Sequence, residues 1–198
     1  PMGQMNPERW ERIAAVQVAN PRHQAGIPNR RCKSSSPFDL SGMQKPPLVL
    51  TLGDGRFVLV HDEVVELIKS RVERGPTSRE TGGILLGSYR GDHIEVSGYT
   101  TPYPRDRRSF ALFDRIDPLH QSIAMKTWQQ SAGTDTYIGE WHTHPQALPT
   151  PSWLDRRTWK TLMRKAHAPM IFAIGGWSGF WWGIASADGL EQLYEHVD

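Results

Sequence analysis

Hydrophobic and polar residues alternate along most of the chain after residue 47 in short runs, and longer runs with helical spacing separate them. Two-residue alternation and β-branched or aromatic content are typical of strands, while apolar residues three and four apart are typical of amphipathic helices. We predict strands at residues 57–60, 80–88, 93–99, 136–144, 170–177, 180–186 and 191–196, and helices at residues 62–73, 118–131 and from 150 onward. Strands with helices on both faces make an α/β three-layer sandwich.

The last predicted helix has clear start signals. Thr150 suits the N-cap, and Pro151 suits the first helical position, where its missing N–H costs nothing. An apolar stripe follows at Trp153, Leu154, Trp159, Leu162 and Met163. Ser152 and Asp155 stand three apart, so they share a face of the helix at its first turn.

Composition divides the chain into two parts. Residues 1–47 hold seven of the fifteen prolines and seven Lys or Arg against three Asp or Glu, which predicts a proline-rich basic arm before a domain at residues 48–198. The domain itself then has sixteen basic and eighteen acidic residues, which argues against nucleic-acid binding. The chain has no membrane-length apolar run and no secretory leader, and its single cysteine suits a reducing cytosol, so we expect a cytoplasmic protein.

The candidate chemistry is concentrated in the last strand before the Thr150 helix. His142 and His144 are two residues apart on a predicted strand, so both imidazoles can point to one place. Asp155 stands eleven positions after His144, at the start of the helix. Two imidazoles and one carboxylate leave a fourth position open for water, which is the arrangement of a catalytic Zn²⁺ site.

Other polar residues are weaker candidates. Glu140 points with the two histidines if the strand is regular, either to support the site or as a charge at a packing edge. His61, His93, His120 and His167 lie at the ends of predicted elements without ligand spacing, so we expect surface or capping roles for them.

The extended pattern of His-Thr-His-Pro, six residues, Ser, two residues and Asp resembles the JAMM motif of the JAB/MPN metalloproteases. That family contains deubiquitinating and related isopeptidases, and its upstream glutamate motif matches Glu80-Thr-Gly-Gly-Ile-Leu-Leu-Gly87. The resemblance implies a cytidine-deaminase-like three-layer sandwich with a curved mixed β-sheet flanked by helices. It also implies that His142, His144 and Asp155 bind Zn²⁺, that Glu80 is the general base, and that Ser152 helps to stabilise the oxyanion. For Ser152, an ordinary helix-start serine stays open as the alternative.

Among bacterial members, the chain looks most like the small JAB proteases of CBASS antiphage operons. Those enzymes remove a CD-NTase, a cGAS-like synthase, from the targets to which an E1/E2-like partner conjugates it. The resemblance implies a zinc-dependent isopeptidase or peptidase that acts at the extended C-terminal tail of a conjugated protein, with no membrane partner. The alternatives are a JAB peptidase that processes a ubiquitin-like sulfur carrier, and a non-catalytic MPN scaffold.

The segment from Tyr99 to Asp114 is polar and arginine-rich, with Arg105, Arg107 and Arg108. In eukaryotic relatives of that family, an insertion near this segment binds the ubiquitin-like partner. Extended tails commonly bind along a sheet edge through main-chain hydrogen bonds. We therefore expect this segment to be a loop that lines the substrate groove, with the three arginines in contact with the substrate.

Overall fold

A computed structural model describes residues 46–75, 78–110, 112–186 and 188–197. The arm predicted at residues 1–47 lies almost entirely outside the described residues, as does Cys32. The boundary between the arm and the domain therefore stays a prediction.

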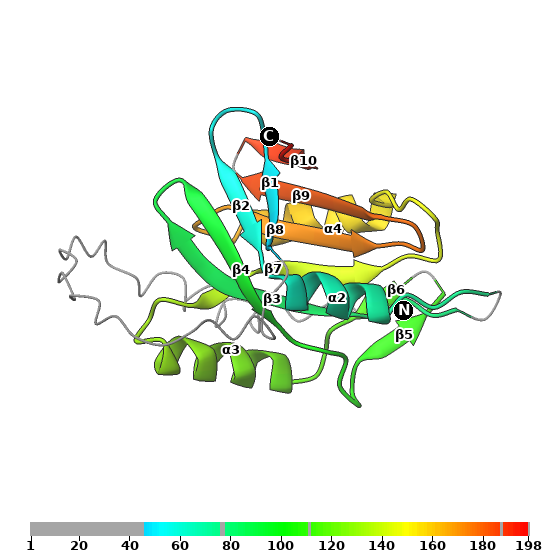
Figure 1. Ribbon diagram of the computed structural model, residues 1–198. Coiled ribbons are helices and arrows are strands. Elements are labelled where there is room, and N and C mark those ends of the chain that lie inside the picture. The colour runs from blue at the N-terminus through cyan, green and yellow to red at the C-terminus, as the bar shows by residue number, and fades with distance from the viewer. Residues whose placement is uncertain (1–45, 76–77, 111, 187, 198) are drawn as a thin grey trace, which may run out of the picture.

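One mixed β-sheet forms the centre of the domain (Figure 1). Its strands are β1 (Leu48–Thr51), β2 (Phe57–Val60), β3 (Gly82–Arg90), β4 (His93–Tyr99), β7 (Thr136–Thr143), β8 (Met170–Gly175), β9 (Phe180–Ser186) and β10 (Gly189–Glu195). They lie in the order β1-β10-β9-β8-β7-β3-β4-β2, and β1 pairs with β2 to close the sheet into a barrel. The pairs β2–β4 and β7–β8 are parallel, and the other pairs are antiparallel.

Among the described residues, three helices pack on the two faces of this sheet. On one face, α2 (Asp62–Ser70) buries Val64, Val65 and Ile68 in a core cluster with residues of the strands. On the other face, α3 (Leu119–Gln130) contributes Ala124 to a second cluster, and α4 (Trp153–Met163) contributes Trp159 and Leu162. Figure 1 shows α2 and α4 on opposite sides of the strands.

The predicted α/β architecture, with a curved mixed sheet between helices, is confirmed. The structure adds that the sheet curves far enough for its first two strands to complete a barrel. No helix in the described part of the chain is long and apolar enough to cross a membrane.

A small hairpin occupies the segment that was predicted to be a loop. Strands β5 (Arg107–Ser109) and β6 (Leu112–Asp114) pair antiparallel, apart from the main sheet. Three residues are too few for a two-residue alternation to stand out in the sequence, so the prediction of a loop was wrong here.

Two element starts beside the site also differ from the prediction. The strand expected from Glu80 begins at Gly82, which leaves Glu80 in the preceding segment. The N-cap of α4 is Ser152 instead of Thr150, because Ser152 and Asp155 form a capping box through their side chains and backbone N–H groups. Thr150 cannot form a capping box, since the residue three positions after it is Trp153, whose side chain has no acceptor for the Thr150 backbone N–H.

Strand β7 is buried along its whole length, and Gly139 sets its distance from β8. A Cβ atom added at Gly139 would overlap the carbonyl oxygen of Ile171 on the neighbouring strand. Only glycine therefore allows the parallel pairing that supports the second half of β7.

We predict that Gly139→Ala lowers the free energy of unfolding by at least about 3 kcal/mol, because the new methyl group pushes β7 and β8 apart. Gly98→Ala on β4 is the matched control, since its Cβ would meet the Leu86 Cβ at 3.3 Å, a contact that a small shift relieves. Urea unfolding of the two variants measures the difference. Equal stabilities would contradict this account.

Candidate metal centre

The two histidines stand at the end of β7. His142 is within the strand, and His144 follows it, held in line by its backbone N–H, which donates to the Gly175 carbonyl at 2.9 Å. The two Nε2 atoms are 3.0 Å apart, and both side chains are buried. The strand geometry therefore brings both imidazoles to one point, as their spacing predicts.

Asp155 reaches the same point from the first turn of α4. Its Oδ1 lies 3.3 Å from His142 Nε2, and its Oδ2 lies 3.4 Å from His144 Nε2. The ligand atoms of the three residues all lie within 4.8 Å of one another. Two imidazole nitrogens and a carboxylate oxygen, converging in a mostly buried place, fit a divalent metal ion that keeps an open coordination position.

Ser152 orients Asp155. Its hydroxyl donates to Asp155 Oδ2 at 2.6 Å, its backbone N–H donates to the same oxygen at 2.7 Å, and its Oγ accepts from the Asp155 N–H at 3.2 Å. The contacts of this serine therefore fix both the start of α4 and the direction of the carboxylate. Its predicted role at the oxyanion stays a prediction.

Glu80 stands beside the three candidate ligands. Its Oε1 is 3.6 Å from His144 Nε2, and the residue is buried. The backbone of Glu80 is fixed from the hairpin: its N–H donates to the Ser109 carbonyl at 2.9 Å, and Arg108 Nε donates to its carbonyl at 3.1 Å. Burial raises the pKa of Glu80 to about 7; the neighbouring His144 opposes this rise, and the Asp155 charge adds to it.

The candidate ligands influence each other's protonation. Burial raises the pKa of Asp155, but hydrogen bonds from His142 and His144 outweigh it and hold that pKa well below its usual range. Burial lowers the pKa of His142. For His144, burial also lowers the pKa, but the hydrogen bond to Asp155 and the Glu80 charge raise it above its usual value. An ionised carboxylate and a neutral His142 are the protonation states that metal binding requires.

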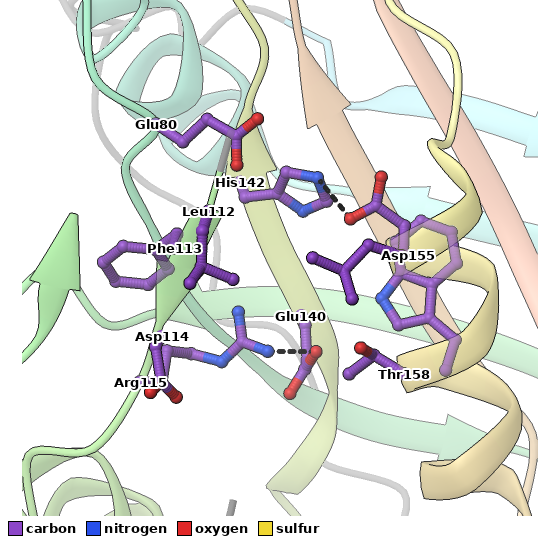
Figure 2. A pocket seen from close by; sticks show the side chains of 11 residues that line it. Glu80, Leu112, Phe113, Asp114, Arg115, Glu140, His142, Asp155 and Thr158 are labelled. Atoms are coloured by element: carbon purple, nitrogen blue, oxygen red, sulfur yellow. Dashed lines mark ion pairs between the residues drawn. The ribbon is translucent and has the colours of Figure 1, made fainter. Parts of the chain in front are cut away.

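A cavity of about 170 Å³ lies next to His142, between the β5–β6 hairpin and α4. Figure 2 shows the side chains around it, and the Arg115–Glu140 ion pair lies across the cavity from Glu80. The lining residues are Glu80, Leu112, Phe113, Asp114, Arg115, Glu140, His142, Leu154, Asp155, Thr158 and Trp159. Arg115 is not predicted from the sequence. A glutamate inside the otherwise apolar run Tyr137-Ile-Gly-Glu-Trp141 indicates a buried cationic partner, but it does not say which one.

Comparison with known proteins identifies the family. Residues 62–189 match the family described as prokaryotic homologs of the JAB domain. The chain belongs to this family. The JAB domain is 33% identical to a CD-NTase/cGAS isopeptidase of Pseudomonas aeruginosa, over 73% of this chain and 94% of the relative. It is 35% identical to a CD-NTase/cGAS isopeptidase of Escherichia coli, over 69% and 86%, and 33% identical to a probable metalloprotease of Sinorhizobium fredii, over 72% and 92%.

The three arginines of the JAB domain's hairpin region have different surroundings. Arg108 bonds to the Glu80 carbonyl and pairs with Glu73 at 2.9 Å, so it supports the segment that carries Glu80. Arg105 donates through its backbone N–H to Asp117 at 3.1 Å, and Arg107 is exposed on β5.

The expectation of a surface or capping role is wrong for His120. This histidine is buried, with Nδ1 2.5 Å from Thr100 Oγ1 and Nε2 2.9 Å from Asp106 Oδ2. The helical spacing of α3 does not reveal this position, because the partners come from the segment between β4 and β5. His120 thereby anchors α3 to the start of that segment.

We predict that this JAB domain binds one divalent ion, with Co²⁺ as a convenient spectroscopic probe. His142→Ala and Asp155→Asn should each weaken Co²⁺ affinity more than about 100-fold, since even loss of an outer partner of a ligand costs 10–100-fold. His167→Ala, at an exposed histidine, is the control and should leave affinity unchanged. Titration followed by absorbance measures all four proteins, and unchanged affinity in either ligand variant would place the ion elsewhere.

Proposed function

We propose that this chain is a zinc-dependent isopeptidase that removes a CD-NTase from proteins to which a bacterial E1/E2-like system has conjugated it, in CBASS antiviral defence. The observation that carries the proposal is the convergence of His142, His144 and Asp155, with the buried Glu80 carboxylate beside them. Relatives named CD-NTase/cGAS isopeptidase align with the chain over most of their own length, which supports this substrate over a sulfur carrier.

Zinc suits the proposed ligands, because two imidazoles and one carboxylate are a common set for catalytic Zn²⁺. When bound there, zinc supplies a water molecule of lowered pKa and polarises the carbonyl of the scissile bond. The remaining chemistry belongs to residues of this chain.

Glu80 is the proposed general base and acid. It accepts the proton of the attacking water and then delivers it to the amine nitrogen of the departing lysine. A carboxyl with its pKa near 7 is suited to both steps at neutral pH. The bonds from Ser109 and Arg108 to its backbone hold it in reach of the site.

Ser152 has a second proposed role besides orienting Asp155. It stands at the N-terminus of α4, where the helix dipole favours negative charge. We propose that its hydroxyl turns from Asp155 Oδ2, which keeps the bond from the Ser152 backbone N–H, and donates to the scissile carbonyl oxygen as charge develops there.

The substrate is proposed to enter as an extended C-terminal tail between the hairpin and α4. Arg105 and Arg107 would contact this tail, because both are exposed in the hairpin region. Arg108 would contribute mainly through Glu80, since its guanidinium already bonds there and to Glu73.

We predict that Glu80→Gln lowers kcat for a CD-NTase–target conjugate about 1,000-fold, because the amide cannot carry the proton. The variant should keep its Zn²⁺ content, measured by elemental analysis, since Glu80 is not among the proposed ligands. A variant with wild-type kcat would remove Glu80 from the mechanism. A wild-type protein that leaves the conjugate intact but processes a ubiquitin-like sulfur carrier would refute the proposed substrate.

A second prediction separates the two roles of Ser152. Ser152→Ala and Ser152→Gly both remove the hydroxyl, but alanine at an N-cap costs about 1 kcal/mol of stability and glycine only a few tenths. If the hydroxyl acts on the scissile carbonyl, both variants lose kcat to the same extent at full Zn²⁺ content, while their unfolding free energies differ. A loss of Zn²⁺ in both variants would instead assign the lower kcat to the lost bond between Ser152 and Asp155. If kcat instead follows stability, with the glycine variant near wild type, Ser152 is a cap only.

A further inference from the structure

Arg115 is a buried cation beside the proposed reacting atoms. It follows β6 directly, its side chain is only 6% exposed, and it pairs with Glu140 of β7, whose side chain is 1% exposed. Both residues line the cavity that also borders Glu80, His142 and Asp155. A group bound in this cavity therefore lies next to the place where the bond is cut.

Stability alone does not account for this pair. Burying two charges costs about as much as their attraction returns, and well-packed apolar residues are often equally stable in their place. The guanidinium also has more donors than Glu140 uses. Arg115 Nε has no hydrogen-bond partner among the described residues. Figure 2 shows one guanidinium nitrogen directed at Glu140 and another directed away from it, into the space beneath His142.

The rest of the cavity defines what could fit. Its walls include the apolar side chains of Leu112 and Phe113 from the hairpin and of Leu154 and Trp159 from α4. The volume of about 170 Å³ is on the scale of one large side chain. The cavity thus has an apolar passage that ends in N–H donors, which fits a side chain with an apolar stem and an oxygen at its tip.

Charge decides between an amide and a carboxylate at that tip. Glu140 already offsets the charge of Arg115, and the bound metal ion would offset that of Asp155, so the acidic groups that remain at the cavity are Glu140 and Glu80. A further carboxylate would face these two acidic groups, whereas a neutral amide accepts from Arg115 without that repulsion. The Thr158 hydroxyl also provides an acceptor for the amide N–H groups.

We propose that this cavity is a specificity pocket for a glutamine-type side chain of the substrate residue next to the scissile bond, with Arg115 as its hydrogen-bond donor. The proposal rests on the proposed isopeptidase function. Arg115 then acts by direct contact with the substrate, and Glu140 positions its guanidinium.

The test uses Arg115→Lys, which keeps a cation opposite Glu140 but removes the planar set of donors. Substrates are isopeptide-linked peptides that carry Gln, Glu or Met at each position flanking the scissile bond. At one position, the wild type should cleave the Gln peptide with kcat/KM about tenfold above the Met peptide, the effect of one buried hydrogen bond. In Arg115→Lys this ratio should fall to about 1, because KM rises for the Gln peptide and much less for the Met peptide.

Arg90→Lys is the matched control, because Arg90 also pairs with a glutamate, Glu95, but on an exposed surface. It should keep the wild-type preference. The pocket assignment fails if no position favours Gln, if Glu is preferred to Gln, or if Arg115→Lys lowers Gln and Met cleavage equally. If the wild type cleaves none of the peptides, the proposed function fails. Calorimetric binding of the same peptides to the metal-free proteins still tests the pocket in that case, since the Gln preference and its loss in Arg115→Lys would appear in the affinities.

Discussion

Strand β7 is buried at every position, yet it carries a glutamate and a histidine and leads directly into a second histidine. A polar group without a partner in such a place costs free energy, so each of these side chains must be matched by a residue brought from elsewhere in the chain. Glu140 pairs with Arg115, and Asp155 pairs with His142 and His144. The site consists of the residues that satisfy the polar groups of this strand.

The start of α4 serves the site in two ways. In the capping box, the Asp155 carboxylate accepts the Ser152 N–H and Ser152 Oγ accepts the Asp155 N–H, and the bonds to the carboxylate direct it to the histidines. A helix start and a ligand position therefore depend on one residue. Changes at Ser152 therefore affect folding and chemistry together, and only paired substitutions can separate the two effects.

The hairpin between β4 and α3 builds the opposite side of the cavity. Its backbone and Arg108 hold Glu80 near His144, and Arg115 follows directly after it. His120 and Asp106 anchor the segment around the hairpin to the body of the domain. One short segment thus leads into Arg115, proposed for substrate selection, and holds Glu80, proposed for proton transfer, so its position affects both.

The sequence by itself determined the α/β architecture, most element positions and the candidate ligand set, because these depend on local periodicity and on the two-residue repeat that places His142 and His144 together. Tertiary structure decided what depends on contacts distant in the chain. It closed the sheet into a barrel and placed the hairpin against the segment that carries Glu80. It also buried His120 and chose Arg115 as the partner of Glu140. A charged residue within an apolar run indicates that it needs a buried partner. Only the folded chain shows which residue lies close enough to be that partner.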